Sequence, residues 1–239
     1  MSAETVEELI RIHVATLFGC DADGRLRYVR EPWGDPYAPP RFFMGRTLRG
    51  NVWHFRHDLH EKLTRELNAL CRSEPVATDL THPPRSLNAV RLALQACDQI
   101  TKEERGPAYL IPETVQAPTE GVLITTENCH VLQTEFPWML RHILSDIDIG
   151  PVTGVFARGS AISICYCARL SSSGAEAGVE TLEAMRGRGY ATTAVAAWAV
   201  AIRERGLLPL YSTSWENLGS QGVARRLGMV QYGEDWSIE

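Results

Sequence analysis

Two glycines and two arginines alternate at a point where a strand-like segment meets an Ala-rich segment typical of a helix: Arg186, Gly187, Arg188 and Gly189. Glycine permits positive φ and lets a ligand approach the backbone closely, and the first N–H groups of a helix form a site for an anion. The arginines add positive charge. The pattern predicts a cradle for a phosphate or pyrophosphate, and a tight turn with solvated arginines is the alternative.

Two common phosphate-binding patterns fit this turn poorly. A P-loop has Lys followed by Ser or Thr after its last glycine, whereas Tyr190 and Ala191 stand here. A dinucleotide fingerprint needs a small residue where Thr192 stands, and an acid at the end of the next strand, where the sequence has Tyr-Ser-Thr-Ser at 211–214. Too few residues follow for the second half of such a sheet.

The elements that must position the turn follow from apolar periodicity. Residues 152–157 and 161–170 are expected to form an antiparallel hairpin, because Arg158-Gly159-Ser160 separates them. A strand over 177–182 leads into the turn. The elements expected after it are a helix over 190–205 ended by Gly206, a strand over 208–212, a helix over 217–227 ended by Gly228, and a strand over 229–232.

Residues 1–120 show no pattern typical of a known reaction. Helices are expected over 3–17, 58–71 and 87–100, strands over 26–29, 41–45 and 51–55, and a connector over 75–84. Further strands are expected over 122–125 and 131–134, and a short helix over 137–147.

The C-terminal motifs resemble the GCN5-related N-acetyltransferase (GNAT) superfamily. Arg186-x-x-Gly189-x-Ala191 is similar to its Arg/Gln-x-x-Gly-x-Gly/Ala signature, residues 209–214 resemble its fifth strand, and Asn217-x-x-Ser220 resembles the start of the next helix. The resemblance covers residues 121–239 and is greatest for the FR47-like branch. It implies an α/β (mixed α+β) fold, with a central, mixed, mostly antiparallel sheet flanked by helices. Residues 1–120 would be an N-terminal α+β region that selects the acceptor or forms a pseudo-GNAT half.

The same resemblance implies acetyl-coenzyme A as co-substrate. Backbone amides of the glycine turn would bind its pyrophosphate, and backbone groups near the end of the preceding strand would contact the pantetheine arm and polarise the thioester carbonyl. By position, the implied cofactor-binding residues are Thr181, Leu182, Arg186, Gly187, Arg188, Gly189, Tyr190, Ala191, Thr192, Asn217 and Ser220. Asn217 is equally explained as a helix N-cap.

The acid and base are less clearly marked. Many family members carry a tyrosine as general acid where this sequence has Ala224. Tyr211 is our candidate substitute, with Ser214 and Tyr232 as alternatives. Glu180 is the candidate base, because a carboxylate in an apolar strand would have a raised pKa. It can also point to solvent.

The expected function is therefore an acetyl-coenzyme-A-dependent N-acyltransferase that acts on a primary amine of a small molecule by direct attack in a ternary complex. One alternative is a coenzyme A-binding sensor or scaffold without turnover. Another is an acyltransferase for aminoacyl-tRNA or a protein N-terminus.

Composition limits the remaining classes. The chain has 239 residues and a net charge of −5. This charge excludes a protein that coats nucleic acid through an overall positive charge, and it argues against a nucleic-acid partner. No segment is apolar and long enough to cross a membrane, and no secretory signal is recognisable, so we expect a cytoplasmic protein with free thiols. A homodimer is possible. No metal is expected, because His54, His57 and His60 are explained by a helix entry, and 21–24 by a turn.

Overall fold

The computed structural model describes residues 3–145 and 147–239. Its helices are α1 (Ala3–Leu17), α2 (Glu61–Ser73), α3 (Leu87–Gln95), α4 (Pro137–Ile143), α5 (Tyr190–Glu204) and α6 (Leu218–Arg226), with short 3-10 helices η1 (Cys129–Leu132) and η2 (Glu183–Met185). Its strands are β1 (Phe18–Cys20), β2 (Leu26–Val29), β3 (Phe42–Arg46), β4 (Asn51–Phe55), β5 (Glu103–Leu110), β6 (Val122–Ile124), β7 (Val152–Ala157), β8 (Ser160–Leu170), β9 (Gly174–Thr181), β10 (Leu208–Ser212) and β11 (Val230–Ile238).

Nine of these strands form one sheet in the order β4-β3-β11-β5-β10-β9-β8-β7-β6, and β1 and β2 form a separate pair. Within the described residues, β9 and β10 are the one parallel pair of neighbours in the large sheet. The sheet is therefore mixed and mostly antiparallel, as expected.

Successive residues of β9 show which helix covers which face of the sheet. Ala175 packs among side chains of α5, including Trp198, whereas the next residue, Glu176, lies beside His13 of α1. Because successive strand residues point to opposite faces, α5 and α1 cover opposite faces here.

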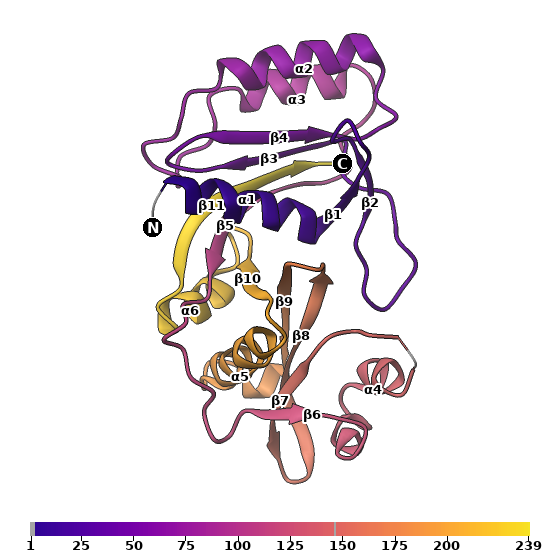
Figure 1. The fold of residues 1–239 in the computed structure, drawn as a ribbon, viewed down its shortest axis with the longest axis vertical. Helices are drawn as coiled ribbons and strands as arrows, with labels where there is room; N and C mark the ends of the chain where they lie inside the picture. Colours follow the sequence, from indigo (N-terminus) through magenta and orange to yellow (C-terminus); the bar gives the residue numbers. More distant parts are fainter. Residues whose placement is uncertain (1–2, 146) are drawn as a thin grey trace.

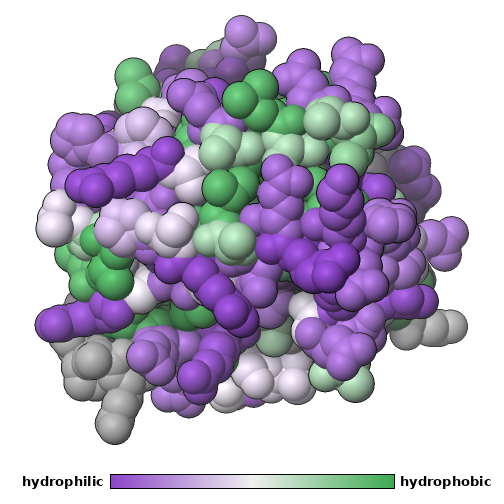
Figure 2. Space-filling view, turned by 90° about the horizontal axis from the view of Figure 1, so that it is seen from above, coloured by the Kyte–Doolittle hydropathy of each residue, from purple (hydrophilic) through white to green (hydrophobic). Residues whose placement is uncertain are grey.

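Helices α2 and α3 cover the far end of the sheet, over β3, β4 and β11 (Figure 1). Leu67 and Leu94 from these helices pack against Phe42, Met44 and Trp236. The molecule seen from this end is mainly hydrophilic, with apolar residues exposed in several places (Figure 2). The amphipathic pattern of each helix thus places its apolar side on the sheet.

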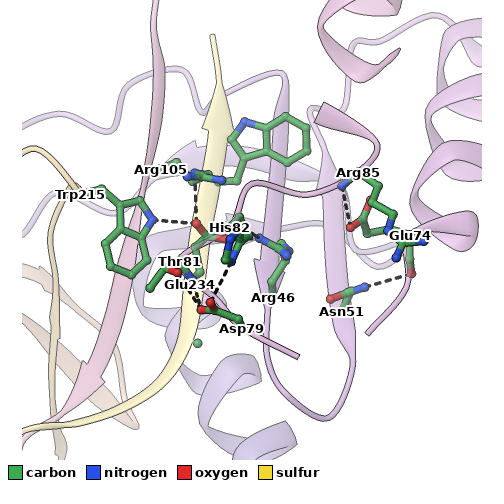
Figure 3. A network of polar contacts seen from close by, with 12 residues as sticks. Arg46, Asn51, Glu74, Asp79, Thr81, His82, Arg85, Arg105, Trp215 and Glu234 are labelled. Atoms are coloured by element: carbon green, nitrogen blue, oxygen red, sulfur yellow. Dashed lines mark hydrogen bonds and ion pairs between the residues drawn. The ribbon is translucent and has the colours of Figure 1, made fainter. Parts of the chain in front are cut away.

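A buried carboxylate, Glu234 of β11, joins three neighbouring strands (Figure 3). It pairs with Arg46 of β3, and its Oε1 lies 3.1 Å from Nε of Arg105 on β5. The indole N–H of Trp215 donates to the same oxygen at 2.7 Å, and Arg46 also donates to the carbonyl of His82 at 3.0 Å. The network fixes β3, β11 and β5 to the segment that follows β10.

Glu74 fixes the loop between α2 and α3 in a similar way. Its carboxylate accepts hydrogen bonds from the backbone N–H groups of Arg85 at 3.0 Å and Ser86 at 2.7 Å. The side chain of Asn51 on β4 donates to its carbonyl at 3.2 Å (Figure 3). The loop is therefore tied to the sheet edge by polar contacts.

Most expected elements are present, including the helix over 3–17 and the hairpin of β7 and β8. The strand expected over 131–134 is wrong, because residues 129–132 form η1, which turns Val131 and Leu132 into a buried cluster with Phe136. Strand β5 was not expected from the sequence. It begins with charged residues and its buried central residues are small, so the alternation of apolar and polar residues typical of a strand is not visible. The helix expected over 137–147 ends at Ile143, and residue 146 lies outside the described residues.

Strands from both sides of residue 120 share the large sheet. Strand β5 pairs with β10 and with β11, so residues 103–110 lie between two C-terminal strands. The division into regions 1–120 and 121–239 stays a prediction, and β5 is the element that any test of it must include.

Replacing Glu234 should destabilise the fold. Glu234→Gln removes the negative charge between two arginines whose desolvation it offsets, and we expect the free energy of unfolding to fall by about 3 kcal/mol. Urea unfolding followed by tryptophan fluorescence measures this. The exposed Glu216→Gln is the matched control and should stay within about 0.5 kcal/mol of wild type. Equal unfolding midpoints for the two variants would contradict the structural role given to Glu234.

Candidate active site

The parallel strands β9 and β10 pair over a short stretch and then separate. The register joins Gly174, Ala175 and Glu176 to residues 208–210, and beyond this point β9 runs on to Thr181 without pairing to β10. A cleft of about 900 Å³ opens here, between the two strands, the glycine turn, α5 and α6. This volume lies in the range of small-molecule and cofactor sites.

The glycine turn has the backbone conformation that the sequence predicts. Gly187 and Gly189 have φ of 77° and 89°, which a side chain would strain. Gly189 is the N-cap of α5 and gives no side-chain cap, so the N–H groups of Tyr190, Ala191 and Thr192 have no acceptor within the helix. These donors face an anion site at the positive end of the helix.

A buried hydroxyl adds to this site. Oγ1 of Thr192 has no hydrogen-bond partner among the described residues, and Thr192 lines the cleft. An unpaired hydroxyl beside free N–H groups is the arrangement that a pyrophosphate would satisfy. The residues present therefore fit the diphosphate of coenzyme A.

Arginines stand at the rim of this cleft. Arg186 lines it and donates from Nε to the carbonyl of Thr181 at 3.4 Å, while Arg188 is exposed and is not among the lining residues. Arg225 and Arg226 at the end of α6 also line the cleft, and the sequence analysis did not include them. Two adjacent arginines near the end of a helix were a signal in the sequence, but the sequence analysis followed the more specific glycine motif instead.

Comparison with known proteins gives the family. The GNAT acetyltransferase family model matches residues 152–236, which hold the cleft strands, the glycine turn and α6. Residues 152–236 belong to the GNAT acetyltransferase family. Membership supports an acetyltransferase activity and leaves the acceptor open. No curated protein matched the sequence.

Several solved structures are similar to this chain. A GNAT-family acetyltransferase from Colwellia psychrerythraea has a TM-score of 0.50 and 13% identity, covering 98% of this chain and 97% of that chain. A GCN5-related N-acetyltransferase-like protein from Streptococcus suis has a TM-score of 0.49 and 17% identity, covering 98% and 99%. A GNAT-family protein from Novosphingobium aromaticivorans has a TM-score of 0.45 and 17% identity, covering 59% of this chain and 65% of that one.

Thr181 and Leu182, at the end of β9, were expected to contact the pantetheine arm of the GNAT co-substrate, and they differ in their hydrogen bonds. The N–H of Leu182 donates to the carbonyl of Ile162 on β8 at 3.0 Å and is therefore occupied. Hydrogen-bonded and non-hydrogen-bonded pairs alternate along antiparallel strands, so the N–H of Thr181, opposite Ser163, points to the other edge of β9. That edge borders the cleft.

Glu180 lines the cleft but is exposed, and it accepts a hydrogen bond of 3.0 Å from the hydroxyl of Tyr166. Our hypothesis of a base relied on removal of this carboxylate from water, and the structure does not provide it. The role of Glu180 as a general base stays a prediction, and the burial from which we derived it is not observed.

Tyr211, Asn217 and Ser220 form one group at the start of α6. The Tyr211 hydroxyl lies 2.6 Å from Oγ of Ser220, and burial raises the pKa of Tyr211 to about 12. Oδ1 of Asn217 accepts the N–H of Ser220 at 3.0 Å, which is the capping bond. All three line the cleft, and their roles toward coenzyme A stay predictions.

Residues of other suggested sites are accounted for within the described part of the chain. Nδ1 of His54 lies 2.8 Å from the carbonyl of Gly24, and His60 accepts the N–H of Lys62 as the N-cap of α2. In residues 3–145 and 147–239, no group of three or more His, Cys, Asp or Glu side chains is arranged so that it could hold a metal ion. Among these same residues, no helix has the length and hydropathy of a membrane span.

Asn217 can be tested for a second role beside capping. Asn217→Ala should lower the free energy of unfolding by about 1 kcal/mol, because the N–H of Ser220 loses its acceptor, whereas Asn217→Asp keeps the cap. Thermal unfolding measures both variants. If Asn217 also contacts coenzyme A, the Asp variant binds it more weakly than wild type despite unchanged stability, and equal binding would leave capping as its role.

Proposed function

We propose that the protein transfers an acetyl group from acetyl-coenzyme A to a primary amine of a small molecule, by direct attack in a ternary complex. The observation that carries the proposal is the separation of two parallel strands over a helix N-terminus with free N–H groups. The opened edge of β9 can hold the pantetheine amides in the manner of an added strand. The first turn of α5 can hold the pyrophosphate.

The residues of the chain supply orientation and charge stabilisation. The N–H of Thr181 would donate to the thioester oxygen as negative charge develops on it. This stabilisation of the oxyanion is expected to contribute most to the rate enhancement. A neutral amine then attacks the carbonyl carbon, and coenzyme A departs as a thiolate. Tyr211 is the candidate that would return a proton to sulfur, since its hydroxyl stays protonated at neutral pH.

A substitution in the glycine turn tests the proposal. Gly189→Glu should weaken acetyl-coenzyme A binding by about tenfold or more, because a carboxylate would repel the diphosphate where the helix dipole now attracts it. Isothermal titration calorimetry measures this. Gly206→Glu is the matched control: Gly206 ends the same helix, has φ of 73°, and a Cβ there also meets open space, so it shares the backbone strain without the cradle. Wild-type protein that does not bind acetyl-coenzyme A would end the proposal.

A coenzyme A-binding protein without turnover is the second candidate. It is favoured by Ala224, which is buried where many family members have the acid tyrosine. Thiol release from acetyl-coenzyme A in the presence of primary amines separates the two, since a sensor binds without release. For the aminoacyl-tRNA alternative, acceptor affinity would depend steeply on salt.

The FR47-like branch, a homodimer and a cytoplasmic location stay predictions.

A further inference from the structure

A second cleft, of about 350 Å³, lies against α1 and meets the first where β9 and β10 separate. Ala177, Ser212 and Thr213 line both clefts. The two spaces are therefore neighbours at the mouth of the strand separation. A molecule in the second cleft could reach an acyl group held in the first through this point.

Glu176 stands at that junction. It is the last residue of β9 that pairs with β10, and it is 5% exposed. One carboxylate oxygen accepts the backbone N–H of Ser212, while the other, Oε2, is buried and has no hydrogen-bond partner among the described residues. A half-satisfied buried carboxylate costs folding free energy, and such groups concentrate at functional sites.

His13 of α1 and Asp235 of β11 complete a buried cluster with Glu176. Nε2 of His13 lies 3.4 Å from Oε2 of Glu176 and 3.4 Å from Oδ2 of Asp235, and it makes no hydrogen bond within the described part of the chain. Nδ1 of His13 lies 2.6 Å from the hydroxyl of Tyr232. Oδ1 of Asp235 is also buried without a partner among these residues. Glu176 and Asp235 line the second cleft, and the fully buried His13 lies against both of them.

The environment of the cluster tunes its charge. Burial raises the pKa of Glu176 to about 7, against the opposing effects of the Ser212 N–H and the Arg169 guanidinium. Burial lowers the pKa of His13 to about 3, and burial, with repulsion from Glu176 and Glu234, raises the pKa of Asp235 well above its usual value. Glu176 is therefore the member that changes charge near neutral pH.

The charged groups that face Glu176 come from every element packed against it. His13 comes from α1, Asp235 and the hydroxyl of Tyr232 from β11, and Arg169 from β8, opposite Glu176 in the register. The guanidinium of Arg169 is already engaged by Glu31 and Tyr37. Glu104 and Arg105 of β5 also line this cleft, and Arg105 pairs through Nε with Glu234 while its Nη1 has no partner among the described residues. The cleft thus has three carboxylates, those of Glu104, Glu176 and Asp235, and two guanidiniums that are each already paired with a carboxylate, a balance that suits a cationic ligand.

We propose that the second cleft binds the acceptor as an ammonium ion and that Glu176 is the general base that removes its proton. This inference rests on the proposed function. His13 and Asp235 act as positioning residues that hold the Glu176 carboxylate. The class of acceptor is a small molecule with a protonated primary amine.

The transfer step balances with this assignment. The ammonium gives one proton to the Glu176 carboxylate, and the freed lone pair forms the C–N bond to the thioester carbonyl carbon. The C–S bond then breaks and leaves its electron pair on sulfur. The nitrogen loses a second proton, which ends on the thiolate, and the amide keeps the third. Glu176 returns its proton to solvent.

Glu176→Gln tests the base directly. We measure thiol release from acetyl-coenzyme A between pH 5.5 and 9, without an added acceptor and with n-butylamine, L-lysine or D-glucosamine. We expect kcat/KM to fall by about 100-fold or more in the variant, and the wild-type increase in rate through about pH 7 to disappear. Glu176→Asp should keep that pH dependence at a reduced rate. Acetyl-coenzyme A should bind all three proteins equally. Glu66→Gln, on the exposed side of α2, is the matched control.

The outcomes separate the two proposals. Turnover of Glu176→Gln within a few-fold of wild type, with the same pH profile, overturns the base and leaves the proposed function standing. Wild-type protein that binds acetyl-coenzyme A and releases no thiol under any of these conditions overturns the proposed function and the base assigned to it. Carbon NMR of glutamate carboxyls provides a readout without turnover: a signal that titrates near pH 7 and is missing from Glu176→Gln supports the assignment, and its absence from wild type overturns it.

Stability should also depend on pH through this residue. Because the pKa of Glu176 rises from 4.5 to about 7 on folding, the folded state binds the proton more tightly, so this group's contribution to stability is lost as pH rises through that window. The urea midpoint of wild type relative to Glu176→Gln should therefore fall between pH 5 and 8. A constant difference would show that Glu176 does not titrate in this range in the folded protein.

Discussion

The structure depends on the point at which the one parallel pair of strands in the described sheet stops pairing. Parallel pairing of β9 and β10 lasts for three residues, after which each strand keeps its antiparallel partner on the other side and the two diverge. A sheet interior normally has no free backbone groups, because unpaired N–H and C=O groups are costly when buried. The divergence exposes such groups along the inner edge of β9, beside the N-terminus of α5. A ligand with amides and phosphates can satisfy both sets at once.

The two clefts at this divergence differ in chemistry, and the difference follows from which helix covers each face. On the α5 side, glycines and free N–H groups accompany Arg186, Arg225 and Arg226, which suits an anion. On the α1 side, the carboxylates of Glu176 and Asp235 lie beside His13, and the cleft is also lined by Glu104, Arg105 and Arg169. Alternation along β9 makes this possible, because Ala175 can pack against α5 while its neighbour Glu176 faces α1.

The local part of this arrangement could be predicted from the sequence, and the long-range part could not. The turn at 186–192, the hairpin of β7 and β8, and the cap at Asn217 depend on residues a few positions apart. By contrast, β5 was missed because it pairs with strands about a hundred residues away, and His13 looks like any polar residue of an amphipathic helix. Glu176 was missed because the expected strand began at residue 177, and only the packing of α1 shows that this carboxylate is buried while that of Glu180 is exposed.

The sheet order gives the N-terminal residues a place in the site itself. Strand β11 pairs with β3 on one side and β5 on the other, and the carboxylate of Glu234 joins Arg46 and Arg105 from those two strands. The next residue of β11, Asp235, faces α1 and His13. Because adjacent strand residues point to opposite faces, the ion network that fixes β11 in the sheet also fixes the position of Asp235 on the other face. The rigidity of the acidic cluster therefore depends on strands contributed by residues before 120, although residues 152–236 carry the family match.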